Sequence, residues 1–190
     1  MVVKERVRPG GRSARIQASV HAAVDALLEQ MDRAELTIPV IAERAGVTPS
    51  TIYRRWGNLG ELLSDVAVKR LRPAAEPADT GTAKSDLLAW AEQYAEEMSS
   101  EVGRAMIRDV MASPTENNAE RCCGYTYEQL QAISDRAEAR GEAGLDVEAV
   151  LDLVVAPIMY RILFLAPPDV AHCRALVERA LPGQGQKRGG

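Results

Sequence analysis

The sequence predicts an all-α protein, and three observations point to this fold class. Helix-forming residues such as Ala, Leu, Glu and Arg dominate the 190 residues, whereas aromatic residues make up only 4%. Apolar residues recur at spacings of three and four, and they seldom alternate with polar residues over the length of a strand. Hydrophobic residues account for 46% and charged residues for 26%, which is ordinary for a globular protein with a packed core.

The first two predicted helices follow a short basic arm that ends at Gly10 and Gly11. An apolar stripe at helical spacing predicts the first helix, through Ile16, Val20, Ala23, Leu27 and Met31. A second stripe predicts a short helix, through Ile38, Ile41, Ala42 and Ala45. Thr37 stands at the N-cap of this short helix, Pro39 is tolerated in its first turn, and Gly46 stops it.

A third helix is predicted from Pro49 to Trp56. Thr48 can cap its free amides, and a proline at the first helical position lacks the donor that would be unpaired there. Gly57 ends this helix. The sequence Asn58-Leu59-Gly60-Glu61 resembles a capping box that opens a fourth helix, which runs out near Arg72.

Residues 73–82 are rich in Pro, Ala, Gly and acidic residues, so we predict a connection between two domains, 1–72 and 73–190. The net charge of −4 is unevenly divided between them. Residues 1–72 hold 12 Lys and Arg against 8 Asp and Glu, whereas the remainder holds 11 against 19. A basic module on an acidic body is typical of nucleic-acid binding, although a solvated charged face is the common alternative.

Five further helices are predicted after the connection. Their apolar stripes cover residues 87–98, 102–110, 117–137, 147–163 and 170–181. Asn117 and Asp146 can cap the third and fourth of these helices, and Pro157 should kink the fourth.

The helix at 147–163 has almost no polar face. Such a helix must be covered on both sides, one by its own domain and the other by a second subunit. We therefore expect a homodimer formed through the last two helices, with Val155 at the interface.

Residues 37–56 have the layout of a helix-turn-helix, with the small Ala42 where the two helices cross and Gly46 in the tight turn. At about 100° per residue, Ile52 and Trp56 share one face of the second helix and point toward the core.

The opposite face of that helix carries Ser50, Thr51 and Arg54, with Tyr53 and Arg55 on the flanks. Hydroxyl and guanidinium groups suit phosphates and base edges, and Arg54 can grip guanine through two hydrogen bonds. The predicted DNA-binding residues are Thr37, Thr48, Pro49, Ser50, Thr51, Tyr53, Arg54, Arg55 and Arg15. The basic arm can reach a neighbouring groove. The alternatives are a hairpin whose outer face is merely solvated and an arm that serves only solubility.

Residues 12–70 resemble the DNA-binding region of the TetR (tetracycline repressor) family, most specifically in LTIPVIAERAGVTPSTIYRRWGNLGELL at 36–63. ARGEAG at 139–144 and APIMYRILF at 156–164 are similar to a common TetR-type ligand domain. The resemblance implies an N-terminal three-helix helix-turn-helix DNA-binding domain plus a C-terminal helical ligand-binding and dimerisation domain. It further implies a dimer that holds a double-stranded, pseudo-palindromic operator with its third helix in the major groove. A small molecule entering the C-terminal core would release the DNA.

Two positions depart from the family pattern. Leu59 stands where family members commonly have a lysine that contacts a phosphate, and Gly60 replaces a residue that is often acidic. Neither change touches the proposed base-reading face.

In the resembling family the effector pocket lies among the fifth to eighth helices. The candidate ligand-binding residues in that region are Trp90, Tyr94, Met98, Met106, Met111, Tyr127 and Met159. Arg108 and Asp109 could orient a polar ligand. At helical spacing, aromatic residues and methionines more often belong to an ordinary core, and Arg108 and Asp109 could equally face water.

The sequence gives no support for an enzyme. His21 and His172 lie away from other ligands at metal spacing, and no phosphate loop or nucleophile elbow is present, so we expect neither a metal nor a cofactor. A helical adaptor that binds protein through the same motif is the second alternative, and salt-sensitive binding to duplex DNA would separate the two.

The number and spacing of the cysteines and the length of the apolar runs predict that the protein is cytoplasmic. Cys122, Cys123 and Cys173 are an odd set in no metal-ligand spacing, and the adjacent pair is either a redox sensor or simply two small helix residues. The longest apolar stretch, Leu153 to Tyr160, is too short to span a membrane.

Overall fold

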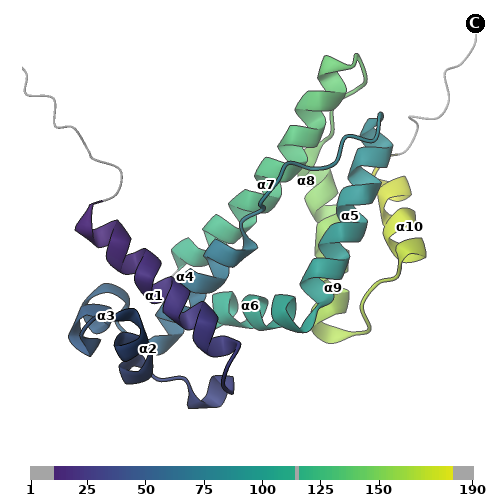
Figure 1. Ribbon diagram of the computed structural model, residues 1–190. Helices are drawn as coiled ribbons and strands as arrows, with labels where there is room; N and C mark the ends of the chain where they lie inside the picture. The colour runs from purple at the N-terminus through teal and green to yellow at the C-terminus, as the bar shows by residue number, and fades with distance from the viewer. Residues whose placement is uncertain (1–10, 114–115, 182–190) are drawn as a thin grey trace, which may run out of the picture. The chain divides into compact units, whose positions relative to one another are not determined.

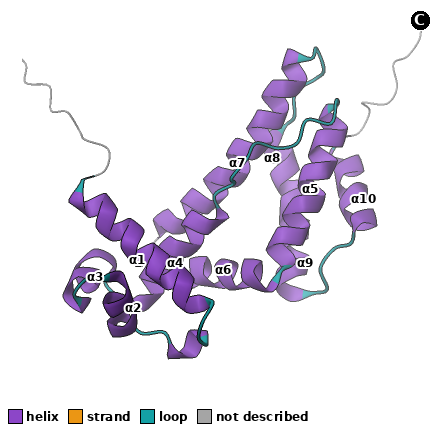
Figure 2. Cartoon of the chain, in the orientation of Figure 1, coloured by secondary structure: helices purple, strands orange, loops and turns teal. Residues whose placement is uncertain are grey.

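The computed structural model describes residues 11–113 and 116–181, without the side chains of 116 and 117. Within these ranges the chain forms helices joined by turns, and no strand is present (Figures 1 and 2), which confirms the predicted all-α fold. The chain divides into two compact units, 1–66 and 67–190, and we describe each by itself. The boundary at 72/73 suggested by composition stays a prediction. The basic arm through Gly10 lies outside the described residues.

The N-terminal unit packs its helices around one apolar cluster. It contains α1 (Arg12–Leu28), the 3-10 turn η1 (Arg33–Glu35), α2 (Ile38–Ala45), α3 (Pro49–Trp56) and the first part of α4 (Leu59–Leu71). The buried cluster consists of Val20, Ala23, Val24, Leu27, Leu36, Ile38, Ile41, Ala42, Ile52, Trp56, Leu62, Leu63 and Val66. The predicted stripes therefore do form the core, with Ile16, Met31 and Ala45 partly buried against it. Met31 lies beyond the end of α1.

The turn between α2 and α3 depends on Gly46, whose φ of 67° is a left-handed conformation that favours glycine. Thr37 and Thr48 occupy the predicted N-cap positions, but neither side chain accepts a hydrogen bond from a helix amide. Asn58 does cap α4, since its Oδ1 accepts the amide of Glu61 at 3.0 Å.

The C-terminal unit is built around α5 (Ala83–Ser99). This helix contacts α6 (Glu101–Ala112), α7 (Glu116–Ala139), α9 (Ala156–Phe164) and α10 (Val170–Ala180). The buried side chains between these helices include Leu87, Ala91, Leu130, Ile133, Val150, Val154, Ile158 and Leu176. α7 begins one residue before Asn117, so that residue does not stand at the N-cap.

The segment predicted as one kinked helix at 147–163 consists of three parts. α8 (Val147–Val150), capped as predicted by Asp146, leads into a π-helical turn, η2 (Leu151–Val155), and then into α9. Pro157 lies in the first turn of α9, directly after the widened turn. A proline lacks the amide that would close the helical ladder, which explains why the irregularity falls here. Val155 is 9% exposed and packs in the core of its own chain, so the expectation that it lies at a subunit interface is wrong.

Residues 73–82, predicted only as a connection, form a strap that is hydrogen-bonded to α5 and α7. The Arg136 guanidinium donates to the Pro77 carbonyl at 2.7 Å, and Gln129 donates to the Ala75 carbonyl at 3.4 Å. At the end of the strap, the amide and hydroxyl of Thr80 donate to Asp86 Oδ1 at 2.6 and 2.7 Å.

Asp86 is fully buried, and Arg140 donates to its second oxygen at 3.0 Å. Burial by itself raises the pKa of Asp86, but the hydrogen bonds from Thr80 and Arg140 outweigh it and lower the pKa below the ordinary value. The carboxylate is thus charged and fixes the strap to both helices.

Candidate nucleic-acid interface and ligand cavity

The exposed face of α3 carries the side chains that the helical geometry predicted. Ile52 and Trp56 are buried, whereas Ser50, Arg54 and Arg55 are exposed and Tyr53 is 52% exposed. Thr51 is half-buried.

A cluster of hydroxyl groups lies at the start of α3. Thr48 Oγ1 is 3.0 Å from Ser50 Oγ and 2.9 Å from Thr51 Oγ1, and Pro49 between them is exposed. Thr37 at the start of α2 and Arg15 on α1 are exposed as well. Hydroxyl groups at a helix N-terminus suit a phosphate, because the amides there carry partial positive charge.

Arg54 and Arg55 differ in what holds them. The Arg55 guanidinium donates to Ser13 Oγ at 2.6 Å and to Gln17 Oε1 at 2.7 Å, and it lies 5.2 Å from the centre of the Trp56 ring. Arg54 makes no hydrogen bond or ion pair to any described residue. The Arg54 guanidinium is therefore available to bind a ligand such as DNA, whereas Arg55 connects α3 to α1 by hydrogen bonds.

On the buried side of α3, one carboxylate oxygen lies within hydrogen-bonding distance of three nitrogen atoms. Asp65 Oδ2 lies 2.9 Å from His21 Nε2, 3.0 Å from Gln17 Nε2 and 3.0 Å from Trp56 Nε1. Sequence reasoning considered His21 only as a metal ligand and missed this group. The spacing of four between positions 17 and 21 was the available signal, because it places both side chains on one face of α1.

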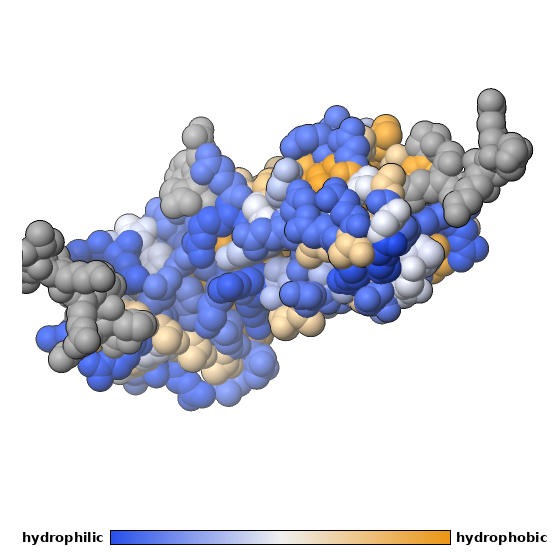
Figure 3. All heavy atoms as spheres, turned by 90° about the horizontal axis from the view of Figure 1, so that it is seen from above, coloured by the Kyte–Doolittle hydropathy of each residue, from blue (hydrophilic) through white to orange (hydrophobic). Residues whose placement is uncertain are grey.

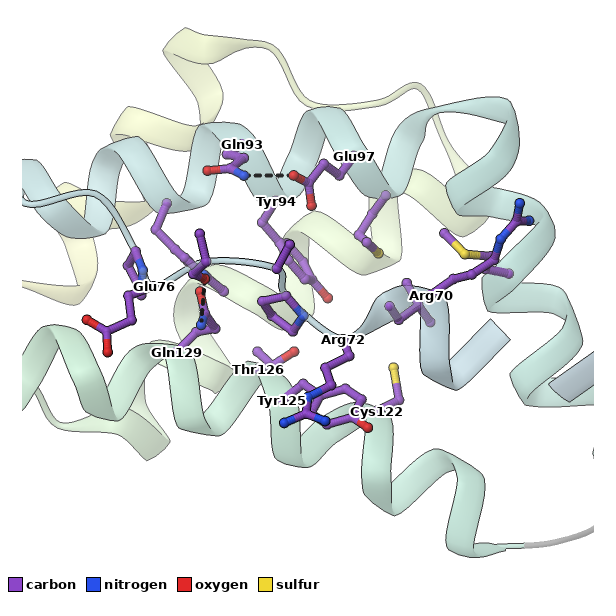
Figure 4. Close-up of a pocket in the computed structure, with 18 of the residues that line it drawn as sticks. Arg70, Arg72, Glu76, Gln93, Tyr94, Glu97, Cys122, Tyr125, Thr126 and Gln129 are labelled. Carbon is purple, nitrogen blue, oxygen red and sulfur yellow. Dashed lines mark hydrogen bonds between the residues drawn. The ribbon is translucent and has the colours of Figure 1, made fainter. Parts of the chain in front are cut away.

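The C-terminal unit contains a partly open cavity of about 580 Å³. α5 and α7 face each other across it, and the end of α4 with the strap closes one side (Figure 4). Its lining comprises residues 70–78, Trp90, Gln93, Tyr94, Glu97, Met98, Ser100, Met106, Cys122, Tyr125, Thr126 and Gln129.

Four of the predicted ligand-binding residues, Trp90, Tyr94, Met98 and Met106, line this cavity. The other three lie elsewhere. Met111 and Tyr127 are 69% and 42% exposed, and Met159 packs against the main core. Arg108 and Asp109 do not line the cavity either.

The deeper lining of the cavity is uncharged. The Trp90 and Tyr94 rings stack with centroids 5.0 Å apart. Burial raises the pKa of Tyr94 well above its usual range, a hydrogen bond with Thr126 opposing the shift only in part, and burial raises the pKa of Cys122 to about 11. Both groups are protonated at neutral pH.

The charged lining residues are instead the exposed ones: Arg70, Arg72, Glu76 and Glu97. Figure 4 shows Glu97 accepting a hydrogen bond from Gln93, at 2.7 Å. The cavity thus has a polar rim and a neutral, aromatic and sulfur-rich interior.

Apolar side chains are also exposed on the C-terminal segments. Leu153, Tyr160, Leu163, Phe164, Leu165 and Val170 are 38–68% exposed. We call these six residues the apolar face. On the side of the molecule drawn in Figure 3, most residues are hydrophilic and an orange area marks where hydrophobic side chains reach the surface.

In the described part of the chain, no three His, Cys, Asp or Glu side chains gather as a metal site would require. Nor is any helix within residues 11–113 and 116–181 long and apolar enough to cross a membrane.

A helix-turn-helix with an exposed second helix, followed by a helical domain that contains a cavity, defines a DNA-binding regulator. Residues 22–66 match the family model "Bacterial regulatory proteins, tetR family", and residues 77–180 match "Tetracyclin repressor-like, C-terminal domain". The chain belongs to the TetR family.

Relatives and solved structures agree with this assignment. The chain is 31% identical to the HTH-type transcriptional regulator YdeS of Bacillus subtilis over 88% of each chain. It is 27% identical to the regulator Rv1556 of Mycobacterium tuberculosis, over 80% of this chain and 79% of that one. A TetR transcriptional regulator from Rhodococcus sp. RHA1 has the same fold, with a TM-score of 0.62 at 16% identity over 90% of this chain and 98% of that one.

The protein is therefore a DNA-binding transcriptional regulator of the helix-turn-helix type and not an enzyme. Regulators of this family bind DNA and act as dimers.

Proposed function

We propose that the protein is a homodimeric repressor that binds a pseudo-palindromic operator through α3 and leaves it when a small molecule fills the cavity. The observation that carries the proposal is the course of α4, which links α3 to the cavity. This helix begins beside α3 in the N-terminal unit, and its last residues, Arg70 and Leu71, line the cavity. A relative from Mycobacteroides abscessus that is 30% identical, over 74% of this chain, is named a DNA-binding transcriptional repressor. The regulator acts in the cytoplasm, where its operator DNA is.

In this proposal Arg54 reads a base, because it is exposed and carries two parallel donors. The hydroxyls of Thr48, Ser50 and Thr51 face the phosphates at the start of α3, and the exposed Pro49 lies against the DNA beside them. Thr37, Tyr53, Arg55 and Arg15 supply the remaining contacts to the DNA backbone.

The chemistry of the cavity favours an uncharged effector that carries an aromatic ring. A charged ligand would lose its hydration against Trp90, Tyr94 and Met98, with no buried opposite charge to compensate. A flat ring can stack on Trp90 and Tyr94, and the flexible Met98 and Met106 side chains can adjust to the shape of the ligand. A volume of about 580 Å³ lies within the range typical of small-molecule sites.

The second subunit covers the apolar face. Six large apolar side chains exposed together on neighbouring segments are unusual on a monomer, and a two-fold axis would pair the face with its own copy. The last two helices, α9 and α10, thus supply the interface, together with η2.

Selection of binding sites from random duplexes tests the DNA-binding part of the proposal. We expect one enriched sequence with two inverted half-sites spaced by about one helical turn. A pool without enrichment, or affinity that does not fall with salt, would favour the adaptor alternative.

The effector class is tested with two probes of the same ring size, 2-naphthol, which is neutral at neutral pH, and 2-naphthoate, which is an anion. Only 2-naphthol should raise the melting temperature of the protein and release the selected operator. Tyr94→Ala should weaken that response, whereas Tyr127→Ala, outside the cavity, should not. Preferential binding of 2-naphthoate would refute the effector class while leaving DNA binding untouched.

A further inference from the structure

Three helices of the N-terminal unit meet at a single carboxylate oxygen. Asp65 Oδ2 is within 3.0 Å of three nitrogen atoms, from His21, Gln17 and Trp56. The side chains of His21 and Asp65 are only 3% and 13% exposed, and Trp56 is buried. Bonds to an ionised acceptor away from water are about twice as strong as neutral ones.

The three donors come from two helices, and the acceptor comes from a third. His21 and Gln17 project from α1, Trp56 is the last residue of α3, and Asp65 belongs to α4. The carboxylate therefore joins α1, α3 and α4 at one point, where an apolar contact would allow them to slide.

The same group extends to the surface of α3. Gln17 donates to Asp65 through Nε2 and accepts from Arg55 through Oε1 at 2.7 Å. Arg55 also lies over the Trp56 ring, whose Nε1 donates to Asp65. The orientation of Arg55 thus depends on Asp65 through two separate routes.

We propose that Asp65 is the positioning residue that sets α3 for operator recognition. This inference rests on the proposed function, because it takes operator recognition by α3 as the property that Asp65 supports. Asp65 does not touch the DNA. It acts through Trp56, Gln17 and Arg55.

The test compares Asp65→Asn with Glu43→Gln. Both substitutions remove one negative charge from the N-terminal unit, and Glu43 is an exposed residue of α2. Each protein is titrated against the selected operator and against a scrambled duplex of the same length. Asp65→Asn should lower the ratio of operator to scrambled affinity about tenfold, the loss expected for one charge-assisted hydrogen bond. Glu43→Gln should keep the wild-type ratio.

Thermal unfolding identifies a variant that fails to fold. If Asp65→Asn does not fold, Trp56→Phe replaces it, since this change removes the indole N–H donor and keeps an aromatic side chain. Trp56→Phe should also lower the ratio of operator to scrambled affinity. If Asp65→Asn does fold, adding Trp56→Phe to it should lower the ratio little further, because both changes break the same hydrogen-bonded group.

A folded Asp65→Asn protein with the wild-type ratio would overturn the proposal. An equal loss on both duplexes would also overturn it, because that result indicates general destabilisation and not positioning. If the wild-type protein itself does not distinguish operator from scrambled duplex, the proposed function fails instead. Non-additive melting temperatures of the Asp65 and Trp56 variants would then still report the coupling.

Discussion

Arg54 and Arg55 are adjacent in the sequence, yet only the structure separates their roles. Helical geometry placed Arg54 on the outward face and Arg55 on its flank, and both are exposed. The sequence could not show that Arg55 is held by Ser13 and Gln17, because those contacts join positions about 40 residues apart. The surroundings of Leu59 also become clear only in the structure, where this residue is half-buried against the N-terminal core.

Arg54→Ala tests the base-reading assignment at this scale. The variant should lose about 1–3 kcal/mol of binding free energy on the selected operator and become indifferent to the base at one position of each half-site. Affinity measurements on operators substituted at each position give both quantities. Arg108→Ala, an exposed cation on α6, is the control and should behave as wild type. Unchanged preference at every position would show that Arg54 does not read a base.

At the scale of single elements, periodicity and capping signals located most helices. Gly46, Asn58 and Asp146 act at the helix ends where the sequence placed them. The π-helical turn at Leu151–Val155 and the strap escaped prediction. The strap escaped because its order comes from Arg136 and Arg140, which lie more than 50 residues away in the sequence and leave no local pattern.

Asp86→Asn should loosen the strap. Removing the charge weakens bonds to Thr80 and Arg140, and we expect a loss of about 1.5–3 kcal/mol of unfolding free energy at neutral pH. The pKa of Asp86 is lower in the folded chain than its ordinary value of 3.8. Its stabilisation is therefore present above about pH 4 and is lost as the pH falls through the folded pKa.

Melting curves across pH check this expectation. The gap between Asp86→Asn and wild type should be full at neutral pH and should close in strong acid. Asp152→Asn, at an exposed position, should show no such gap. A gap that widens in acid would contradict the assignment.

The corner between α5 and α6 requires a glycine. A Cβ atom at Gly103 would collide with the Glu97 carbonyl oxygen and lie 2.9 Å from Met98 Cα, both of them backbone atoms that cannot turn aside. Gly103→Ala should therefore cost about 1–3 kcal/mol of unfolding free energy.

Gly124→Ala is the matched control for that change. Gly124 lies within α7, and a Cβ there meets nothing within 4 Å. Alanine should raise stability by about 0.5–1 kcal/mol, because it favours the helix. Chemical denaturation of both variants gives the two signs, and a stable Gly103→Ala protein would show that the corner can open.

At the scale of the whole molecule, the all-α fold and the helix-turn-helix followed from periodicity, and the family models confirm both parts of the resemblance. The expectation for Val155 needed correction. Val155 faces its own core, whereas Phe164, in the same apolar stretch, is 68% exposed. A segment that is apolar all round carries no pattern that distinguishes a side chain in its own core from an exposed one, so the sequence could not separate these two residues.

Phe164→Glu should weaken the dimer about thirtyfold without unfolding the protomer, as expected for one well-buried aromatic contact. Sedimentation equilibrium and circular dichroism measure the two properties. Val155→Glu should instead unfold the chain, and Met111→Glu, exposed on α6, should do neither. An unchanged dimer in Phe164→Glu would remove the apolar face from the interface.

The most direct test of the account is the affinity ratio of the wild-type dimer for its selected operator over a scrambled duplex of equal length. Fluorescence anisotropy at physiological salt gives both constants. We predict that the operator binds at least about 10³-fold more tightly, the lower end of the range for specific regulators. Equal affinity for the two duplexes would contradict the claim that α3 reads a DNA sequence.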